Sequence, residues 1–180
     1  MEHSRLEPDS RAATAVFREP GRTPPASTLV LGFGNVLLGD DGAGVRIALR
    51  LRDEMGADAA LFVDAGTLSF SLLSYVEDAN TMLIIDAADL GAAAGSVECF
   101  EGAHMDRYLQ GTRRRTVHEI GLIDLLDMAR ILHKLPARRA LLCIQPSRIE
   151  WSEALTPVVS AALPEAIRTA KAVLKGWQTP

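Results

Sequence analysis

Residues 28–44 read Thr28-Leu-Val-Leu-Gly-Phe33 and then Gly34-Asn-Val-Leu-Leu-Gly-Asp-Asp-Gly-Ala-Gly44. The first six residues are a short apolar run that ends among glycines, which is the pattern of a buried strand. The rest is a glycine-rich loop that carries two adjacent carboxylates. Residues 42–54 place apolar side chains at helical spacing, so a strand, a loop and a helix are predicted in that order.

The remaining chain repeats this alternation. Further strands are predicted over residues 60–64, 81–86, 96–101 and 139–145, and further helices over 68–76, 119–133 and 156–175. Crossovers long enough for a helix make the first three strands parallel, whereas residues 88–95 are too few and predict an antiparallel fourth strand. A loop is expected after residue 101, and Pro164 allows a kink or a break in the last helix. The predicted fold class is α/β, a three-layer α/β/α sandwich around a five-stranded, mostly parallel sheet.

Length and composition limit the classes of protein to which this chain can belong. A chain of 180 residues suits one domain, and its 48% hydrophobic and 23% charged residues exclude a disordered chain and a coiled-coil rod. Residues 28–180 are predicted to form a single α/β domain. Residues 1–27 hold four of the nine prolines without sustained periodicity, which predicts a flexible N-terminal extension.

Charge, cysteine count and apolar runs exclude several functions. A net charge of −4 disfavours a nucleic-acid binder. Cys99 and Cys143 are too few for a disulfide scaffold and lack the spacing of a zinc site. No apolar run approaches the roughly 18 residues of a membrane span, and charges interrupt any signal-peptide core. We therefore expect a cytoplasmic protein that contacts neither nucleic acid nor membrane.

The glycine-rich loop does not match the nucleotide-binding loops. A dinucleotide fingerprint that starts at Gly32 needs a third glycine where Leu37 stands. The carboxylates of Asp40 and Asp41 would repel a pyrophosphate at the start of the following helix. A P-loop is excluded as well, because no Gly-Lys-Ser/Thr follows.

Carboxylates follow the strands at the points where ligands bind to open α/β sheets. Asp40 and Asp41 precede the first helix, and Asp86 ends the third strand. A cap or a turn is the alternative interpretation of each, and one of the two adjacent aspartates suffices to cap the helix. Asp64 ends a strand that should lie at the sheet edge, and it is predicted to orient the Gly66-Thr67 turn.

A histidine completes the set of candidate ligands. His118 stands directly before the predicted helix 119–133, where a cap or a solvated loop residue is the alternative interpretation. If it reaches the same sheet edge as the aspartates, two carboxylates and one imidazole form a plausible site for nickel, zinc or iron.

Four segments together resemble the maturation endopeptidases of nickel–iron hydrogenases. They are Leu31-Gly-Phe-Gly-Asn-Val-Leu-Leu-Gly-Asp-Asp-Gly-Ala-Gly44, Asp64-Ala-Gly-Thr67, Leu83-Ile-Ile-Asp-Ala87 and His118-Glu-Ile-Gly-Leu122. The resemblance extends through Leu155-Thr-Pro157 to about residue 175 and leaves out the N-terminal extension.

This resemblance implies a fold, an activity and a site. The strand order would be 2-1-3-5-4 with strand 4 antiparallel. The enzyme would remove a C-terminal peptide from the precursor of the hydrogenase large subunit after nickel insertion. The family's metal-contacting positions fall on Asp41, Asp86 and His118, and the nickel would be carried by the precursor. We expect a monomer that has this precursor as its partner.

The mechanism expected from these residues is metal-assisted hydrolysis. Asp41, Asp86 and His118 would reach the nickel of the docked precursor, and Asp40 would orient a ligand or take a proton. No Gly-x-Ser-x-Gly elbow is present and neither cysteine lies in a motif, which disfavours a serine or cysteine nucleophile. The alternative is a non-catalytic nickel-sensing or chaperone-like binding module for hydrogenase assembly, since no general base is identifiable beyond the ligands.

Overall fold

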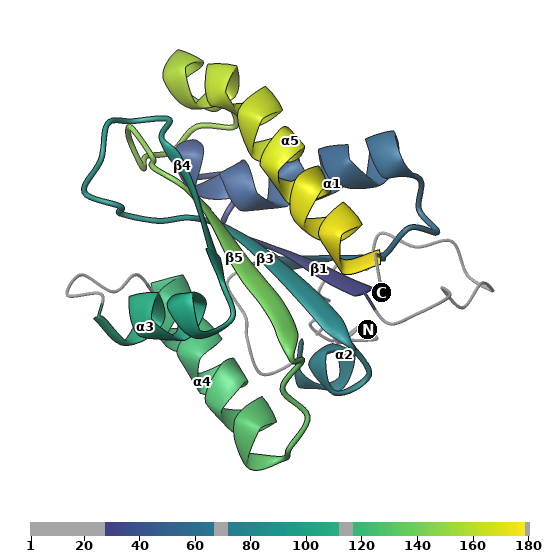
Figure 1. Cartoon of the computed structure of the whole chain (residues 1–180). Helices are drawn as coiled ribbons and strands as arrows, with labels where there is room; N and C mark the ends of the chain where they lie inside the picture. Colours follow the sequence, from purple (N-terminus) through teal and green to yellow (C-terminus); the bar gives the residue numbers. More distant parts are fainter. Residues whose placement is uncertain (1–27, 67–71, 112–116, 179–180) are drawn as a thin grey trace, which may run out of the picture.

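The computed structural model describes residues 28–66, 72–111 and 117–178 (Figure 1). The predicted N-terminal extension, residues 1–27, lies outside the described residues. One sheet runs through the middle of the molecule. Its strands are β1 (Thr28–Phe33), β2 (Leu61–Gly66), β3 (Thr81–Ala87), β4 (Val97–Glu101) and β5 (Arg138–Ile144).

The strand order is β2-β1-β3-β5-β4, and only the β4–β5 pair is antiparallel. Both the order and the antiparallel strand confirm the predicted topology. Parallel pairing aligns Gly32 of β1 with Ile85 of β3, and Asp86 of β3 with Cys143 of β5. The carboxyl ends of these three strands therefore lie at one edge of the sheet.

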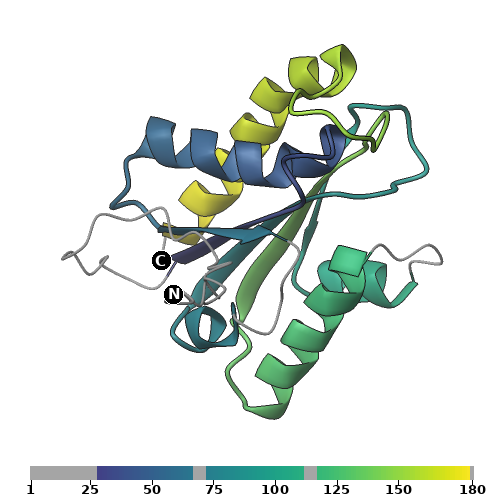
Figure 2. The same ribbon diagram turned by 180° about the vertical axis from the view of Figure 1, so that it is seen from behind.

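Helices cover both faces of the sheet, which confirms the three-layer sandwich. They are η1 (Asp40–Gly42, a 3-10 turn), α1 (Ala43–Met55), α2 (Leu73–Glu77), α3 (Ala103–Gly111), α4 (Val117–Ile131) and α5 (Pro157–Gln178). Helices α1 and α5 lie on one face, and α2, α3 and α4 lie on the other (Figure 2).

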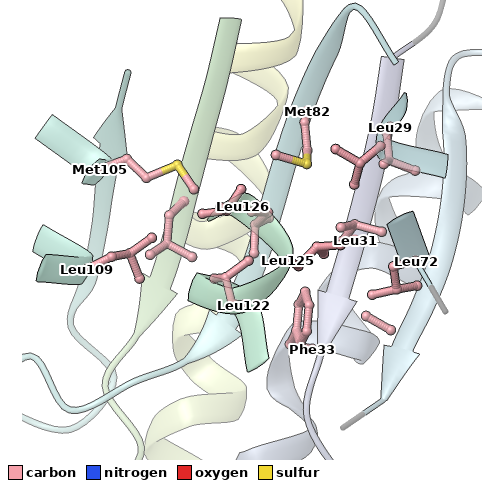
Figure 3. Packing of buried hydrophobic residues seen from close by; sticks show 14 of the residues in the cluster. Leu29, Leu31, Phe33, Leu72, Met82, Met105, Leu109, Leu122, Leu125 and Leu126 are labelled. Carbon is pink, nitrogen blue, oxygen red and sulfur yellow. The ribbon is translucent and has the colours of Figure 1, made fainter. Parts of the chain in front are cut away.

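The alternation of side chains along each strand builds a core on either side of the sheet. In β1, Leu29, Leu31 and Phe33 face the layer of α2, α3 and α4, while Val30 faces the layer of α1 and α5. Figure 3 shows the first of these cores, where leucines of α4 pack over β1 and β3. Aliphatic side chains dominate both cores, as the 5% aromatic content requires.

Two local predictions were wrong. The segment after residue 101 forms helix α3, whose Met105 and Leu109 are buried one turn apart. Helix α4 starts at Val117, so His118 lies inside the helix and not before it. The last helix was predicted to extend to about residue 175, and α5 does run on through Pro164. Within the described residues, no helix combines the length and apolar character that crossing a bilayer requires.

Candidate active site

The start of α1 packs directly against the carboxyl ends of β1 and β3. A Cβ atom on Gly44 would lie 2.4 Å from the carbonyl oxygens of both Phe33 and Ile85, so only glycine allows this approach. The turn η1 before α1 consequently contacts β3. The aspartates of η1 are thereby brought to the sheet edge at which Asp86 ends its strand.

The loop between β1 and α1 folds back on itself. Gly34 has a φ of +121°, and a Cβ atom there would lie 1.8 Å from the carbonyl oxygen of Asp41. A side chain at position 34 is therefore excluded both by the backbone conformation and by the space. This close contact holds Asp41 next to the end of β1.

Asp41 is buried, with 5% of its surface exposed. Its Oδ2 accepts a hydrogen bond of 2.7 Å from the backbone N–H of Asn35. Helix α1 has Gly42 as its N-cap residue and no side-chain capping hydrogen bond. The alternative interpretation of Asp40 or Asp41 as the side-chain cap of this helix was therefore wrong.

Asp86 is also buried, with 2% exposed, and it follows directly on the buried residues Ile84 and Ile85. Side chains alternate along β3: Met82 and Ile84 face the α4 layer, and Leu83 and Ile85 face the α1 layer. By this alternation, position 86 belongs to the α4 side of the sheet.

Helix α4 brings position 118 toward the same edge. The helix has 15 residues and is about 22 Å long, and β5 has 7 residues and spans about 23 Å. The short connection after Ile131 joins the end of α4 to the start of β5, so the start of α4 lies near the carboxyl end of the sheet (Figure 1). His118 occupies the first turn of α4, and its side chain lies outside the described residues.

Asp40 has a different environment from that of its neighbour. It is fully buried, and its carboxylate accepts four hydrogen bonds from the segment between β5 and α5. The donors are the backbone N–H groups of Ser147, Arg148 and Thr156 and the Thr156 hydroxyl, at 2.7–3.1 Å. Burial disfavours the ionised form of Asp40 and raises its pKa. The four hydrogen bonds stabilise the ionised form by more, so the pKa of Asp40 lies below its ordinary value.

These contacts to Asp40 were not predicted from the sequence. The partners stand 107 to 116 residues further along the chain, and none of them carries a chemical motif. The sequence signal closest to these partners is Leu155-Thr-Pro157. It belongs to the resemblance and predicts the start of a helix, but it does not indicate a contact with Asp40.

The structure also gives the environments of Asp64 and of the two cysteines. Asp64 Oδ1 accepts a 2.8 Å hydrogen bond from the N–H of Gly66, while Thr67 of the predicted Gly66-Thr67 turn lies outside the described residues. Burial raises the pKa of Asp64, and the Gly66 hydrogen bond opposes the rise. Burial and then the Glu101 charge raise the pKa of the Cys99 thiol to about 11, so the thiol is protonated at neutral pH. Cys143 is buried.

The described residues place two candidate ligands, Asp41 and Asp86, at one edge of the sheet. Among the side chains described, no group of three or more His, Cys, Asp or Glu residues is positioned to hold a metal ion. The side chain of His118 is not among those described. Two buried carboxylates supply the hard oxygen donors that divalent metal ions accept.

Solved structures share this architecture. The hydrogenase maturating endopeptidase HybD from Escherichia coli superimposes with a TM-score of 0.75 and 29% sequence identity, over 83% of this chain and 93% of that chain. A [NiFe] hydrogenase maturation protease from Thermococcus kodakarensis gives a TM-score of 0.71 at 26% identity, over 82% of this chain and 99% of that one.

Sequence comparison identifies the family. The model of the hydrogenase maturation protease family matches residues 45–173. The chain belongs to this family. The hydrogenase expression/formation protein HupD of Rhizobium leguminosarum bv. viciae is 32% identical over 87% of this chain and 78% of its own length. The resemblance seen in the four sequence segments therefore extends over most of this maturation protease. A peptidase function is confirmed.

Proposed function

We propose that this maturation protease removes a C-terminal peptide from the precursor of the nickel–iron hydrogenase large subunit after nickel insertion. The observation that carries the proposal is the pair of buried carboxylates, Asp41 and Asp86, at the carboxyl edge of the sheet in a chain of this family. Burying a carboxylate is costly, and two at one edge indicate a site built for a cation or for proton transfer.

In this proposal the nickel is part of the substrate. Asp41, Asp86 and His118 contact the nickel that the precursor carries, so only a loaded precursor is positioned for cleavage. Position 118 lies four and seven residues before Leu122 and Leu125, which are buried against the sheet, so it is on the sheet-facing side of the α4 backbone. A metal ion at such a site polarises a carbonyl group or lowers the pKa of a bound water molecule.

Asp40 suits an orienting role better than that of a proton acceptor. Its four hydrogen bonds stabilise the ionised carboxylate and lower its pKa, which weakens it as a base. The same bonds fix the turn that carries Asp41.

The cytoplasmic location and the monomeric state expected from the sequence stay predictions.

A cleavage assay tests this function. The purified chain is incubated with large-subunit precursor, either nickel-loaded or nickel-free, and the large subunit is weighed by mass spectrometry. A large subunit shortened at its C-terminus only in the nickel-loaded sample supports the proposal. Stable binding of the loaded precursor without shortening would favour the nickel-sensing or chaperone-like module instead.

The isolated protease should hold nickel only weakly. Two carboxylates and one imidazole leave coordination positions open, so another molecule must complete the site. We expect nickel added to the purified chain to be lost on dialysis, as measured by elemental analysis of the dialysed protein. Stoichiometric nickel that survives treatment with a chelator would contradict this prediction and would indicate a resident metal centre.

A further inference from the structure

An exposed apolar surface lies beside the candidate site. Seven large hydrophobic side chains are exposed among the described residues, and four of them belong to the loop after β1 and the segment after β5. These four, which we call the loop ridge, are Val36, Leu37, Ile149 and Trp151. Trp151 is the most exposed of the seven, at 79%. Exposed clusters of this kind mark interaction sites more often than isolated apolar residues do.

The two segments of the loop ridge are joined by backbone hydrogen bonds. The N–H of Gly39 donates to the carbonyl oxygen of Ser152 at 2.7 Å, and the N–H of Ser152 donates to the carbonyl oxygen of Leu37 at 3.0 Å. A bridge also pairs Gly39 with Ile149. The buried carboxylate of Asp40 binds both ends of the second segment. The loop ridge is therefore preorganised, which lowers the entropic cost of binding a partner.

The loop ridge is connected to the candidate site through two hydrogen bonds. The N–H of Leu37 donates to Asn35 Oδ1 at 3.0 Å, and the N–H of Asn35 donates to Asp41 Oδ2 at 2.7 Å. The segment that carries Val36 and Leu37 is therefore joined through Asn35 to Asp41 of the candidate site. A substrate chain bound at Asp41 would lie next to this segment.

Two arginines next to the loop ridge are held by partners in the segment after β5. Arg148 Nε lies 3.1 Å from Glu150 Oε1. The guanidinium of Arg46 donates to the backbone carbonyl of Glu153. This pairing leaves the apolar side chains as the distinguishing feature of the surface. A partner with a complementary apolar patch fits it better than a strongly acidic or basic one.

We propose that the loop ridge docks an apolar surface of the hydrogenase large-subunit precursor beside the bond that is cleaved, with Trp151 as the main anchor. This inference rests on the proposed function for the identity of the partner. A second copy of this chain is the competing occupant, but a copy seated on the loop ridge would also cover the edge that carries Asp41. Tryptophan is among the residues that most often dominate binding energy at protein interfaces.

The test compares Trp151→Ala with Ile131→Ser, a matched control at another exposed hydrophobic residue, at the far end of α4. Both full-length variants are assayed with nickel-loaded large-subunit precursor. We expect Trp151→Ala to raise the Kd and the KM for precursor about tenfold or more, with kcat unchanged at saturating precursor. Leu37→Ala should weaken binding in the same direction. The Kd should change little between low and high salt, because apolar contacts are not screened.

The outcomes separate this inference from the proposed function. If the wild type cleaves precursor and Trp151→Ala has the KM of the wild type, the docking proposal is overturned and the function stands. If the wild type binds precursor through Trp151 without cleaving it, the docking proposal stands and the protease function fails. Concentration-dependent self-association that Trp151→Ala abolishes, with no change in precursor binding, would assign the loop ridge to a second copy and overturn the proposal.

Discussion

Replacing Asp86 by asparagine is expected to abolish cleavage of the precursor while leaving the free energy of unfolding within about 1 kcal/mol of the wild type. Asparagine preserves the shape of the side chain but removes the negative charge that a cation requires. Asp86 is buried at the end of a strand, where a carboxylate is costly to place. The same loss of activity is expected for Asp41→Asn and for His118→Ala. Cleavage is followed by mass spectrometry and stability by thermal unfolding.

A matched carboxylate elsewhere should give the opposite result. Asp106 in α3 accepts two hydrogen bonds from the guanidinium of Arg139, at the end of the sheet away from the candidate site. Asp106→Asn should cost about 1–2 kcal/mol of stability and leave cleavage intact. If Asp86→Asn instead lowers stability and retains activity, Asp86 is a structural residue and the proposed site is wrong.

Asp40→Ala is expected to destabilise the fold by about 3 kcal/mol, because one substitution removes the acceptor of four hydrogen bonds. For a domain of this size this corresponds to a fall in Tm of roughly 10 °C. Chemical denaturation of Asp40→Ala and of the wild type measures the loss, and a loss below about 1 kcal/mol would contradict the assigned role of Asp40.

The contribution of Asp40 should depend on pH in a defined direction. Its pKa is lower in the folded protein than in the unfolded chain, where a free aspartate titrates at about 4. The stability that its ionised form supplies is therefore fully present above about pH 4 and is lost as the pH falls through the folded pKa. The difference in unfolding free energy between the wild type and Asp40→Asn should be constant near neutral pH and shrink in acid. A difference that grows in acid would show that folding raises the pKa of Asp40 and does not lower it.

Short-range patterns were sufficient to predict the sheet. The run Thr28–Phe33 is β1 as predicted, because a short apolar stretch that ends among glycines is typical of a buried strand. The connection over residues 88–95 is too short for a helix, and β4 is antiparallel as this length requires. Helix α3 was missed because it buries only Met105 and Leu109 deeply, a pattern too short to stand out from a loop.

The sequence by itself determined that carboxylates stand at the carboxyl ends of β1 and β3, because strand spacing and crossover length are local properties. Spacing alone could not distinguish Asp40 from Asp41, which are adjacent and chemically identical, and only the resemblance gave them different roles. The tertiary structure shows how their environments differ. The segment between β5 and α5 supplies four donors to Asp40, whereas Asn35, six residues earlier in the chain, supplies one to Asp41. Contacts between segments more than 100 residues apart depend on how the layers pack, and no local pattern encodes them.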